Sequence, residues 1–486
     1  MLTQKQILSF YIISGLFIAA NVIAVIFDFY LVSMLPIAFL MVLLALFASD
    51  KLVYFVTGLV PFSIPVWHLL GNFGLILPTE PLIILLMLIG ILKFAIGSQT
   101  AYKSLLRHPL TIAILINTGW LLFTSFTSSM PLVSIKYTVS RIWYIAVFYF
   151  MGYQIFIDYK RIERFLWWFT IPLVIVVIYV MVRHFQHGFV REVFPYMIQP
   201  FFWVHGVYSA TVAIVTPMLV VFFIRSKKMG YSTLTRGFIG LLAIMFLMAI
   251  TYSYTRAAWV SLMAAFGALV VFYIKVPVRY IFGSVIIALL VVFAFQKSIL
   301  LKLSENEQGS SRRNDLGEHL QSVSNIKNDP SNLERINRWN CAIRMFEERP
   351  ILGWGPGTYA FQYAPFQRSK DITVISTNFG DVGHAHSEYL GPLAEGGFIG
   401  MISWLVVFLL SVYKGMMLFY HGIHEKTRTI ALAVVLGLIT YYAHGVLNSY
   451  IDYDKIAVPL WGFCAILVAL EVIDKKLVAD IENNTI

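Results

Sequence analysis

The sequence predicts an all-α polytopic membrane protein with about 12–14 transmembrane helices and one large extracytoplasmic loop that contains short helices. Two observations lead to this fold class. Of the 486 residues, 59% are hydrophobic and only 13% are charged, whereas a soluble domain carries about 25% charged residues. The hydrophobic residues also form successive runs of roughly 17–22, and about 20 helical residues cross the core of a bilayer. The surplus apolar surface is therefore expected to face lipid.

Fourteen apolar runs are candidate spans. In chain order they cover residues 7–28, 31–48, 53–70, 80–97, 109–125, 138–156, 164–182, 206–224, 237–252, 257–274, 280–296, 397–413, 430–446 and 456–472. The first run follows a polar start that contains Lys5, and no small-residue cleavage site comes after it. We therefore interpret it as a retained anchor instead of a removed signal peptide.

The net charge of +11 reflects membrane topology instead of nucleic-acid binding. Residues 297–396 contain eleven Lys and Arg against twelve Asp and Glu, a net of −1, so an excess of +12 lies in the membrane portion. With the N-terminus inside, most of these cations fall in inward loops. The outward loops contain chiefly Lys136, Arg141, Arg183, Arg191, Arg256 and Lys455. This positive-inside asymmetry predicts that both termini are cytoplasmic, and we expect no nucleic-acid partner.

The chain divides into three parts. Residues 1–296 are expected to carry spans one to eleven, and residues 297–396 form the large outward loop with the motifs that carry chemistry. Residues 397–486 carry the last three spans and a short cytoplasmic tail.

Two helices are expected inside the loop. Apolar residues at helical spacing, from Ile336 to Phe346, predict an amphipathic helix over 334–349, which Pro350 and a glycine-rich turn end. A short helix is expected to begin near Ser387, a plausible N-cap, and to stop at Gly396-Gly397 before span twelve.

No residue pattern predicts a cofactor or a metal. The sequence lacks a P-loop and a dinucleotide fingerprint, which counts against an ATP-driven pump. Cys341 and Cys464 provide neither a disulfide framework nor metal-ligand spacing. Asp371 and Asp381 are isolated in the loop, which contains no Asp-x-Asp pair.

Three outward positions carry candidate chemistry: Arg256 between spans nine and ten, Arg335 on the loop helix, and His386 before span twelve. Each also has a structural interpretation. An arginine beside Tyr and Trp anchors a helix at the interface, a helix-surface arginine commonly faces solvent, and a single histidine is most often structural. However, Arg256 runs against the charge rule, and Arg335 and Arg338 both lie close to the apolar stripe of their helix.

The chemistry of these three residues is complementary. Two arginines hold a diphosphate through planar, charge-assisted hydrogen bonds. An imidazole titrates near neutrality and accepts a proton from a hydroxyl. Together they suit the transfer of a sugar from a diphosphate-linked lipid: the arginines neutralise charge on the leaving group, and the histidine deprotonates the attacking hydroxyl.

Three motifs, in this order, resemble those of the O-antigen ligase and O-antigen polymerase superfamily of bacterial envelope enzymes. The first is Thr255-Arg256-Ala257. The second runs from Arg335 to Trp339 and continues through Met345-Phe346 and the stretch 348–357, which reads Glu-Arg-Pro-Ile-Leu-Gly-Trp-Gly-Pro-Gly. The third runs from His384 to Leu390 and continues through 393–397 to Gly400. The resemblance covers roughly residues 205–446.

The resemblance implies that Arg256 and Arg335 bind the donor diphosphate and that His386 is the general base. Arg338 and His384 are the competing choices. Arg335 has the usual four-residue offset from Trp339, and His386 has the better spacing to the residues that follow. Secondary candidates next to the base are Ser387, Glu388 and Tyr389. The family commonly has Asn where this chain has Ser387, which leaves the source of a helper hydrogen bond open.

The resemblance further implies a metal-independent, inverting glycosyltransferase in the bacterial inner membrane. Its donor would be an undecaprenyl-diphosphate-linked glycan, with no cofactor and with membrane lipids as surroundings. The acceptor is the lipid A–core oligosaccharide in a ligase and another lipid-linked repeat unit in a polymerase. We favour the ligase, because a long loop with a single histidine-containing helix resembles that branch. A transporter of the same lipid-linked sugar is less favoured, since transporters place ionisable groups inside their spans.

Overall fold

Helices account for nearly all of the described chain. The computed structural model describes residues 4–66, 75–96, 100–277, 330–373 and 383–484, together with a few isolated residues between them. Within these ranges nine helices are long and apolar enough to cross a membrane, which confirms the predicted all-α polytopic fold. They are α1 (Gln4–Ile26), α4 (Thr79–Ile96), α6 (Pro109–Phe126), α9 (Tyr159–Gln186), α11 (His205–Ile224), α13 (Thr233–Thr251), α14 (Arg256–Tyr273), α19 (Leu390–His421) and α21 (Asp454–Asn484).

Four other expected spans correspond to helices that are shorter, interrupted or less apolar. They are α2 (Leu35–Phe47), α3 (Ser49–Leu59), α7 (Pro131–Tyr144) and α20 (Glu425–His444). α7 continues through a π-helical segment, η3 (Ile145–Met151), into α8 (Gly152–Ile155), so the expected span 138–156 is a continuous helix with a widened middle. The expected span 280–296 lies almost entirely outside the described residues.

The structure contradicts the expectation of one helix over 53–70. α3 ends at Leu59, and a 3₁₀ turn, η2 (Val60–Phe62), follows it. The chain then forms an antiparallel hairpin between β1 (Ile64–Val66) and β2 (Leu75–Leu77). Two prolines in this stretch lack the N–H group that a helix interior requires, which explains why the apolar run does not continue as a helix.

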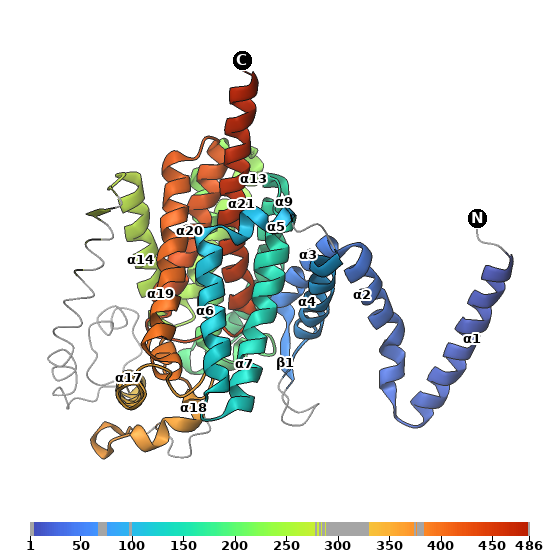
Figure 1. Ribbon diagram of the computed structural model, residues 1–486, viewed down its shortest axis with the longest axis horizontal. Coiled ribbons are helices and arrows are strands. Elements are labelled where there is room, and N and C mark those ends of the chain that lie inside the picture. Colours follow the sequence, from blue (N-terminus) through green and yellow to red (C-terminus); the bar gives the residue numbers. More distant parts are fainter. Residues whose placement is uncertain are drawn as a thin grey trace.

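α20 is the centre of the bundle. It packs against α11, α14, α19 and α21, and together with α11 and α21 it forms the most enclosed part of the hydrophobic core. α1 and α2 stand to one side of the bundle and expose large apolar side chains along their length (Figure 1). Such surfaces are those expected to meet lipid.

The two ends of the bundle carry different elements (Figure 1). α17 (Pro330–Glu348), α18 (Tyr359–Gln362) and the β1–β2 hairpin lie at one end, called here the loop end. α5 (Thr100–Leu106) and the last turns of α21 lie at the opposite end, called the tail end. The remaining short elements are η1 (Tyr30–Met34), η4 (Arg191–Val193), α10 (Phe194–Met197), α12 (Ser226–Met229), η5 (Ala364–Phe366) and η6 (Ser369–Asp371).

α19 consists of two helical pieces joined by a kink at Gly397. This residue has φ 66° and ψ −168°, a region essentially restricted to glycine, so the predicted stop at this position is confirmed. The glycine-rich loop after α17 docks at the kink: the N–H of Phe398 donates to Pro350 O at 2.9 Å, and the N–H of Gly355 donates to Glu395 O at 2.8 Å. These bonds hold the loop, and with it α17, against the bundle.

Candidate active site

Arg338 contacts other residues of the large loop. Its side chain is 4% exposed, and its Nε donates to a carboxylate oxygen of Glu334 at 2.7 Å. Its guanidinium lies over the ring of Tyr363, 4.1 Å from the centroid. A buried pair of this kind fixes local structure, because removing one partner leaves the other charge uncompensated.

Arg335 lies one turn earlier on α17. It is half-buried, and its charge acts on four histidines from three different parts of the chain. These are His205, His384, His386 and His444. His205 begins α11 and His444 ends α20, so the loop end of the bundle gathers several imidazoles around one guanidinium. The charges of Arg335 and Arg338 both act on the His386 ring, and the role of Arg335 in donor binding stays a prediction.

His386 lies in a tight segment directly before α19. Its φ is 50°, an uncommon value for a residue other than glycine and one that is frequent at functional sites. Its N–H donates to Nδ1 of His384 at 3.1 Å, and its carbonyl accepts from the indole N–H of Trp339 at 3.3 Å. The two imidazole rings lie 4.4 Å apart. The backbone thus sets the direction of the His386 side chain.

Both imidazoles of this segment are neutral at physiological pH. Burial, followed by the charges of His384 and Arg335, lowers the pKa of His386 from 6.5 to about 2. Burial, followed by the charge of Arg338, lowers the pKa of His384 to about 4. A neutral imidazole can accept a proton. The buried Nδ1 atom of His386 has no hydrogen-bond partner among the described residues.

Ser387 and Tyr389 serve as anchors for the start of α19. The Ser387 hydroxyl accepts from the N–H groups of Tyr389 and Leu390, both at 3.3 Å, so the serine caps the helix start as predicted. The Tyr389 hydroxyl donates to the carbonyl of Tyr442 at 2.9 Å. Neither side chain is directed at the His386 ring by these bonds.

Glu388 ties the His386 segment to the turn between α20 and α21. It is 4% exposed, and one of its carboxylate oxygens accepts from the N–H groups of Tyr450 at 2.7 Å and Ile451 at 2.9 Å, and from the Tyr441 hydroxyl. Its own N–H donates to the carbonyl of Gly445 at 2.7 Å. Burial, and then the negative charge of Asp452, raise the pKa of Glu388.

The same turn contains residues that the sequence analysis did not single out. The four histidines on which the charge of Arg335 acts are called here the histidine cluster. Asn448 contacts His444 and Tyr450 contacts His384, both of this cluster, and Asp452 forms an ion pair with Arg141 of α7 at 2.8 Å. The signal that could have found them is the polar stretch 448–454 between two apolar runs.

Arg256 is the first residue of α14 and is half-buried. In the turn before it, Tyr254 has φ 51°, and its hydroxyl donates to the carbonyl of Phe189 at 2.6 Å. That bond joins the turn to the segment after α9. The bond therefore fixes the backbone of the turn that leads into Arg256. The part of Arg256 in donor binding stays a prediction.

The described ranges contain no group of three or more His, Cys, Asp or Glu side chains placed to hold a metal ion. Asp371 pairs with Arg344 at 2.5 Å, and Asp381 lies outside the described residues. Cys341 and Cys464 are both buried free thiols.

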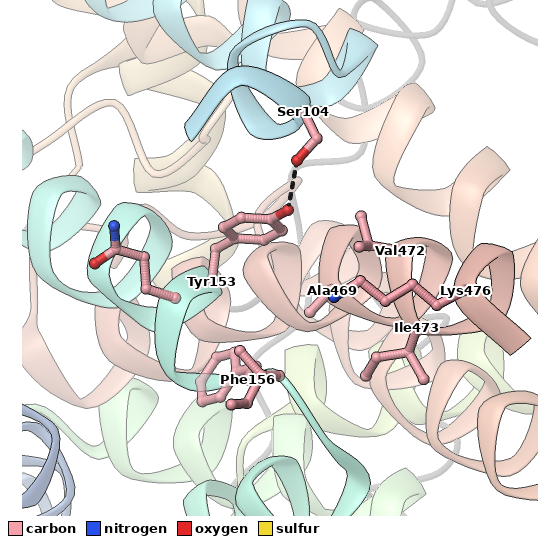
Figure 2. A pocket seen from close by; sticks show the side chains of 9 residues that line it. Ser104, Tyr153, Phe156, Ala469, Val472, Ile473 and Lys476 are labelled. Carbon is pink, nitrogen blue, oxygen red and sulfur yellow. Dashed lines mark hydrogen bonds between the residues drawn. The ribbon is translucent and has the colours of Figure 1, made fainter. Parts of the chain in front are cut away.

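A cavity of about 410 Å³ lies near the tail end, between α5, α8 and α21 (Figure 2). The Ser104 and Tyr153 hydroxyls in its wall lie 2.9 Å apart, beside apolar residues and Lys476. None of the candidate site residues lines this cavity. It is therefore separate from the histidine cluster at the loop end.

Comparison with known proteins identifies one domain. Residues 241–405 match the model of a family described as O-antigen ligase. The matched range contains Arg256, Arg335 and His386, but it ends before the turn that carries Asn448.

The chain is also similar to a curated protein of Haemophilus influenzae (strain Rd) that is described as uncharacterized. The two are 24% identical over 226 residues, which is 46% of this chain and 52% of the relative. The chain thus spans about half the length of the curated relative that it matches.

Proposed function

We propose that this chain, whose residues 241–405 match the family described as O-antigen ligase, transfers a glycan from an undecaprenyl-diphosphate-linked donor to an acceptor hydroxyl. The favoured acceptor is lipid A–core, as in an O-antigen ligase. The alternative is a second lipid-linked repeat unit, as in a polymerase. The reaction would be inverting and metal-independent, at the periplasmic face of the bacterial inner membrane, with both termini in the cytoplasm.

The observation that supports this proposal most is the placement of a neutral imidazole beside a guanidinium. The Nδ1 atom of His386 is buried without a partner, and the charge of Arg335 acts on the same ring. Arg338, the competing arginine, forms a buried ion pair with Glu334, and its charge acts on the same ring. A base and an anion-binding group at one place are what transfer from a diphosphate donor requires.

Each residue then has one task. Arg335 and Arg256 would hold the diphosphate and compensate the charge that develops on it as the anomeric carbon–oxygen bond breaks. His386 would take the proton of the acceptor hydroxyl. The electron pair of that oxygen–hydrogen bond would form the new glycosidic bond, and the pair of the broken bond would leave with the diphosphate.

Donor binding would raise the low pKa of His386 toward the range that suits a base. Without donor, burial and the neighbouring positive charges hold this pKa near 2, well below the value that suits a base at neutral pH. A diphosphate bound to Arg335 brings negative charge beside the imidazole, which favours the protonated ring and raises its pKa. The base would therefore become effective once the donor is in place.

The test is product analysis with purified protein in lipid nanodiscs, supplied with a lipid-linked glycan and each acceptor in turn. A ligase caps the core oligosaccharide, and a polymerase lengthens the lipid-linked glycan. We expect His386→Ala and Arg335→Ala to lower product formation by at least about 100-fold, the usual contribution of a general base or an anion-stabilising group. His187→Ala, an exposed histidine after α9, is the matched control. Near-normal product from His386→Ala would overturn the proposal.

A further inference from the structure

The walls of the tail-end cavity change from apolar to charged along their length. On α21 the apolar residues Val472 and Ile473 line it, and Lys476 lines it one turn later. On the wall that follows α8, Ile157 lines it and the charged Asp158 comes directly after. In a membrane helix such a change marks the level of the lipid headgroups, where tyrosines and cationic side chains gather. The cavity therefore lies at the boundary between acyl chains and headgroups.

Hydroxyl and ammonium groups line the charged side of this cavity. The Ser104 and Tyr153 hydroxyls form one hydrogen bond with each other at 2.9 Å, so one of the two O–H groups remains to donate to a further partner. The Lys476 side chain extends along α21 toward Tyr153 (Figure 2). A lysine ammonium and a hydroxyl donor together suit a phosphate group, because both donate hydrogen bonds and the lysine compensates the negative charge.

The acidic residues of this part of α21 are occupied elsewhere. Glu471 accepts from Nζ of Lys414 and Nζ of Lys475, both at 2.8 Å. Asp474 accepts from the backbone of the turn between α19 and α20. Lys476, in contrast, forms no ion pair with any residue that the structure describes. Its charge is therefore available to an anion from outside the chain.

A second cavity, of about 220 Å³, lies earlier along the same helix. It is lined by apolar side chains and one glycine, among them Leu106, Phe150 and Met151. Phe150 of η3 and Tyr153 of α8 are three residues apart and so lie on one helix face. Leu106 and Ser104 both belong to α5. The two cavities thus share two walls, and the apolar one is suited to an acyl chain.

We propose that the tail-end cavity binds the phosphate group of an anionic phospholipid from the surrounding bilayer, with Lys476 as the counter-charge and an acyl chain in the apolar cavity. Its volume of about 410 Å³ is within the usual range of ligand pockets. Basic pockets between membrane helices are also typical sites for acidic headgroups. The cavity is separate from the histidine cluster, so the inference goes beyond the proposed function and does not depend on it.

The experiment titrates the purified full chain in detergent with phosphatidylglycerol and measures bound lipid by native mass spectrometry and Tm by thermal unfolding. Phosphatidylcholine, whose choline group cancels the phosphate charge, is the lipid control, and inorganic phosphate tests for a site that takes a free anion. We expect phosphatidylglycerol to bind more tightly than phosphatidylcholine and to raise Tm with its concentration. Inorganic phosphate should leave Tm unchanged.

Two substitutions locate the lipid. Lys476→Ala should weaken phosphatidylglycerol binding about fivefold, the effect of one lysine near an anionic lipid surface. Lys475→Ala is the matched control, because it removes the same charge from the next residue, whose side chain is 72% exposed and pairs with Glu471. It should leave the Kd for phosphatidylglycerol nearly unchanged. Tyr153→Phe removes a hydroxyl and should weaken binding about two- to tenfold.

Three outcomes overturn the inference: equal affinity for phosphatidylglycerol and phosphatidylcholine, an equal loss in Lys475→Ala and Lys476→Ala, or a rise in Tm with inorganic phosphate as large as that with phosphatidylglycerol. His386→Ala, measured in parallel, should bind phosphatidylglycerol like the unmodified protein whatever happens to its turnover. Failure of the lipid site and failure of the proposed function are therefore distinguishable.

Discussion

Replacing Gly397 by alanine should destabilise the protein, because the kink of α19 requires a residue without a side chain. At φ 66° and ψ −168°, a residue other than glycine is strained by about 1–3 kcal/mol. A Cβ atom would also lie 2.2 Å from the carbonyl oxygen of Ile351 and 2.7 Å from that of Pro350. These carbonyls must move, which weakens the bond from Phe398 N–H to Pro350 O, worth about 1 kcal/mol. We expect a total loss of about 2–4 kcal/mol.

Gly391→Ala is the matched control in the same helix. A Cβ there meets only the side chain of Ala385, at an ordinary 3.9 Å, and alanine favours the helix by up to about 1 kcal/mol. Thermal unfolding in nanodiscs should therefore show a lower Tm for Gly397→Ala and an equal or higher Tm for Gly391→Ala. Limited proteolysis should show faster cleavage in the glycine-rich loop of Gly397→Ala alone. Equal Tm values for the two variants would refute the reasoning.

Three further predictions concern the loop end. Arg338→Ala should lower the free energy of unfolding by about 3 kcal/mol, because it leaves a buried carboxylate unpaired; a Tm equal to that of the unmodified protein would contradict this. Glu388→Ala leaves three buried donors unsatisfied and should lower the free energy of unfolding by about 3–6 kcal/mol, while Glu388→Gln, which keeps an acceptor, should retain most of the stability. Equal losses in the two variants would show that the Glu388 carboxylate does not hold the turn. The folded-state pKa values of His384 and His386, about 4 and about 2, lie below the ordinary 6.5. The unfolded chain thus binds more protons than the folded chain below pH 6.5, and each histidine should lower the free energy of unfolding by about 2 kcal/mol between pH 7 and pH 5. A His384→Ala/His386→Ala double variant should show a flatter Tm–pH curve than the unmodified protein, and an identical curve would contradict this.

The membrane helices were predictable because bilayer thickness fixes the length of an apolar run. That rule located α9, α11 and α21 from composition alone. It failed at 53–70, where the apolar run ends as a hairpin. Pairing with residues 75–77 decides that structure, and run length contains no information about such a pairing.

The grouping of Arg335 with His386 was predicted from the motifs, and in the structure the charges of Arg335 and Arg338 both act on the His386 ring. The choice of Arg335 over Arg338 stays a prediction. The place of the turn after α20 was not predicted from the sequence. This turn lies beside the His386 segment because α20 packs beside α19 and Glu388 holds the turn, and both depend on contacts between residues far apart in sequence. The stretch 384–390 therefore predicted a candidate site but not the residues of the turn that hold it in place.

In the proposed reaction, His386 removes the proton of the acceptor hydroxyl while Arg335 holds the donor. The most direct test is release of undecaprenyl diphosphate by His386→Ala at saturating donor, with donor affinity measured in the same preparation. We expect donor Kd within about twofold of the unmodified protein and a turnover at least about 100-fold lower. Turnover that is retained while the donor is bound normally would contradict the claim.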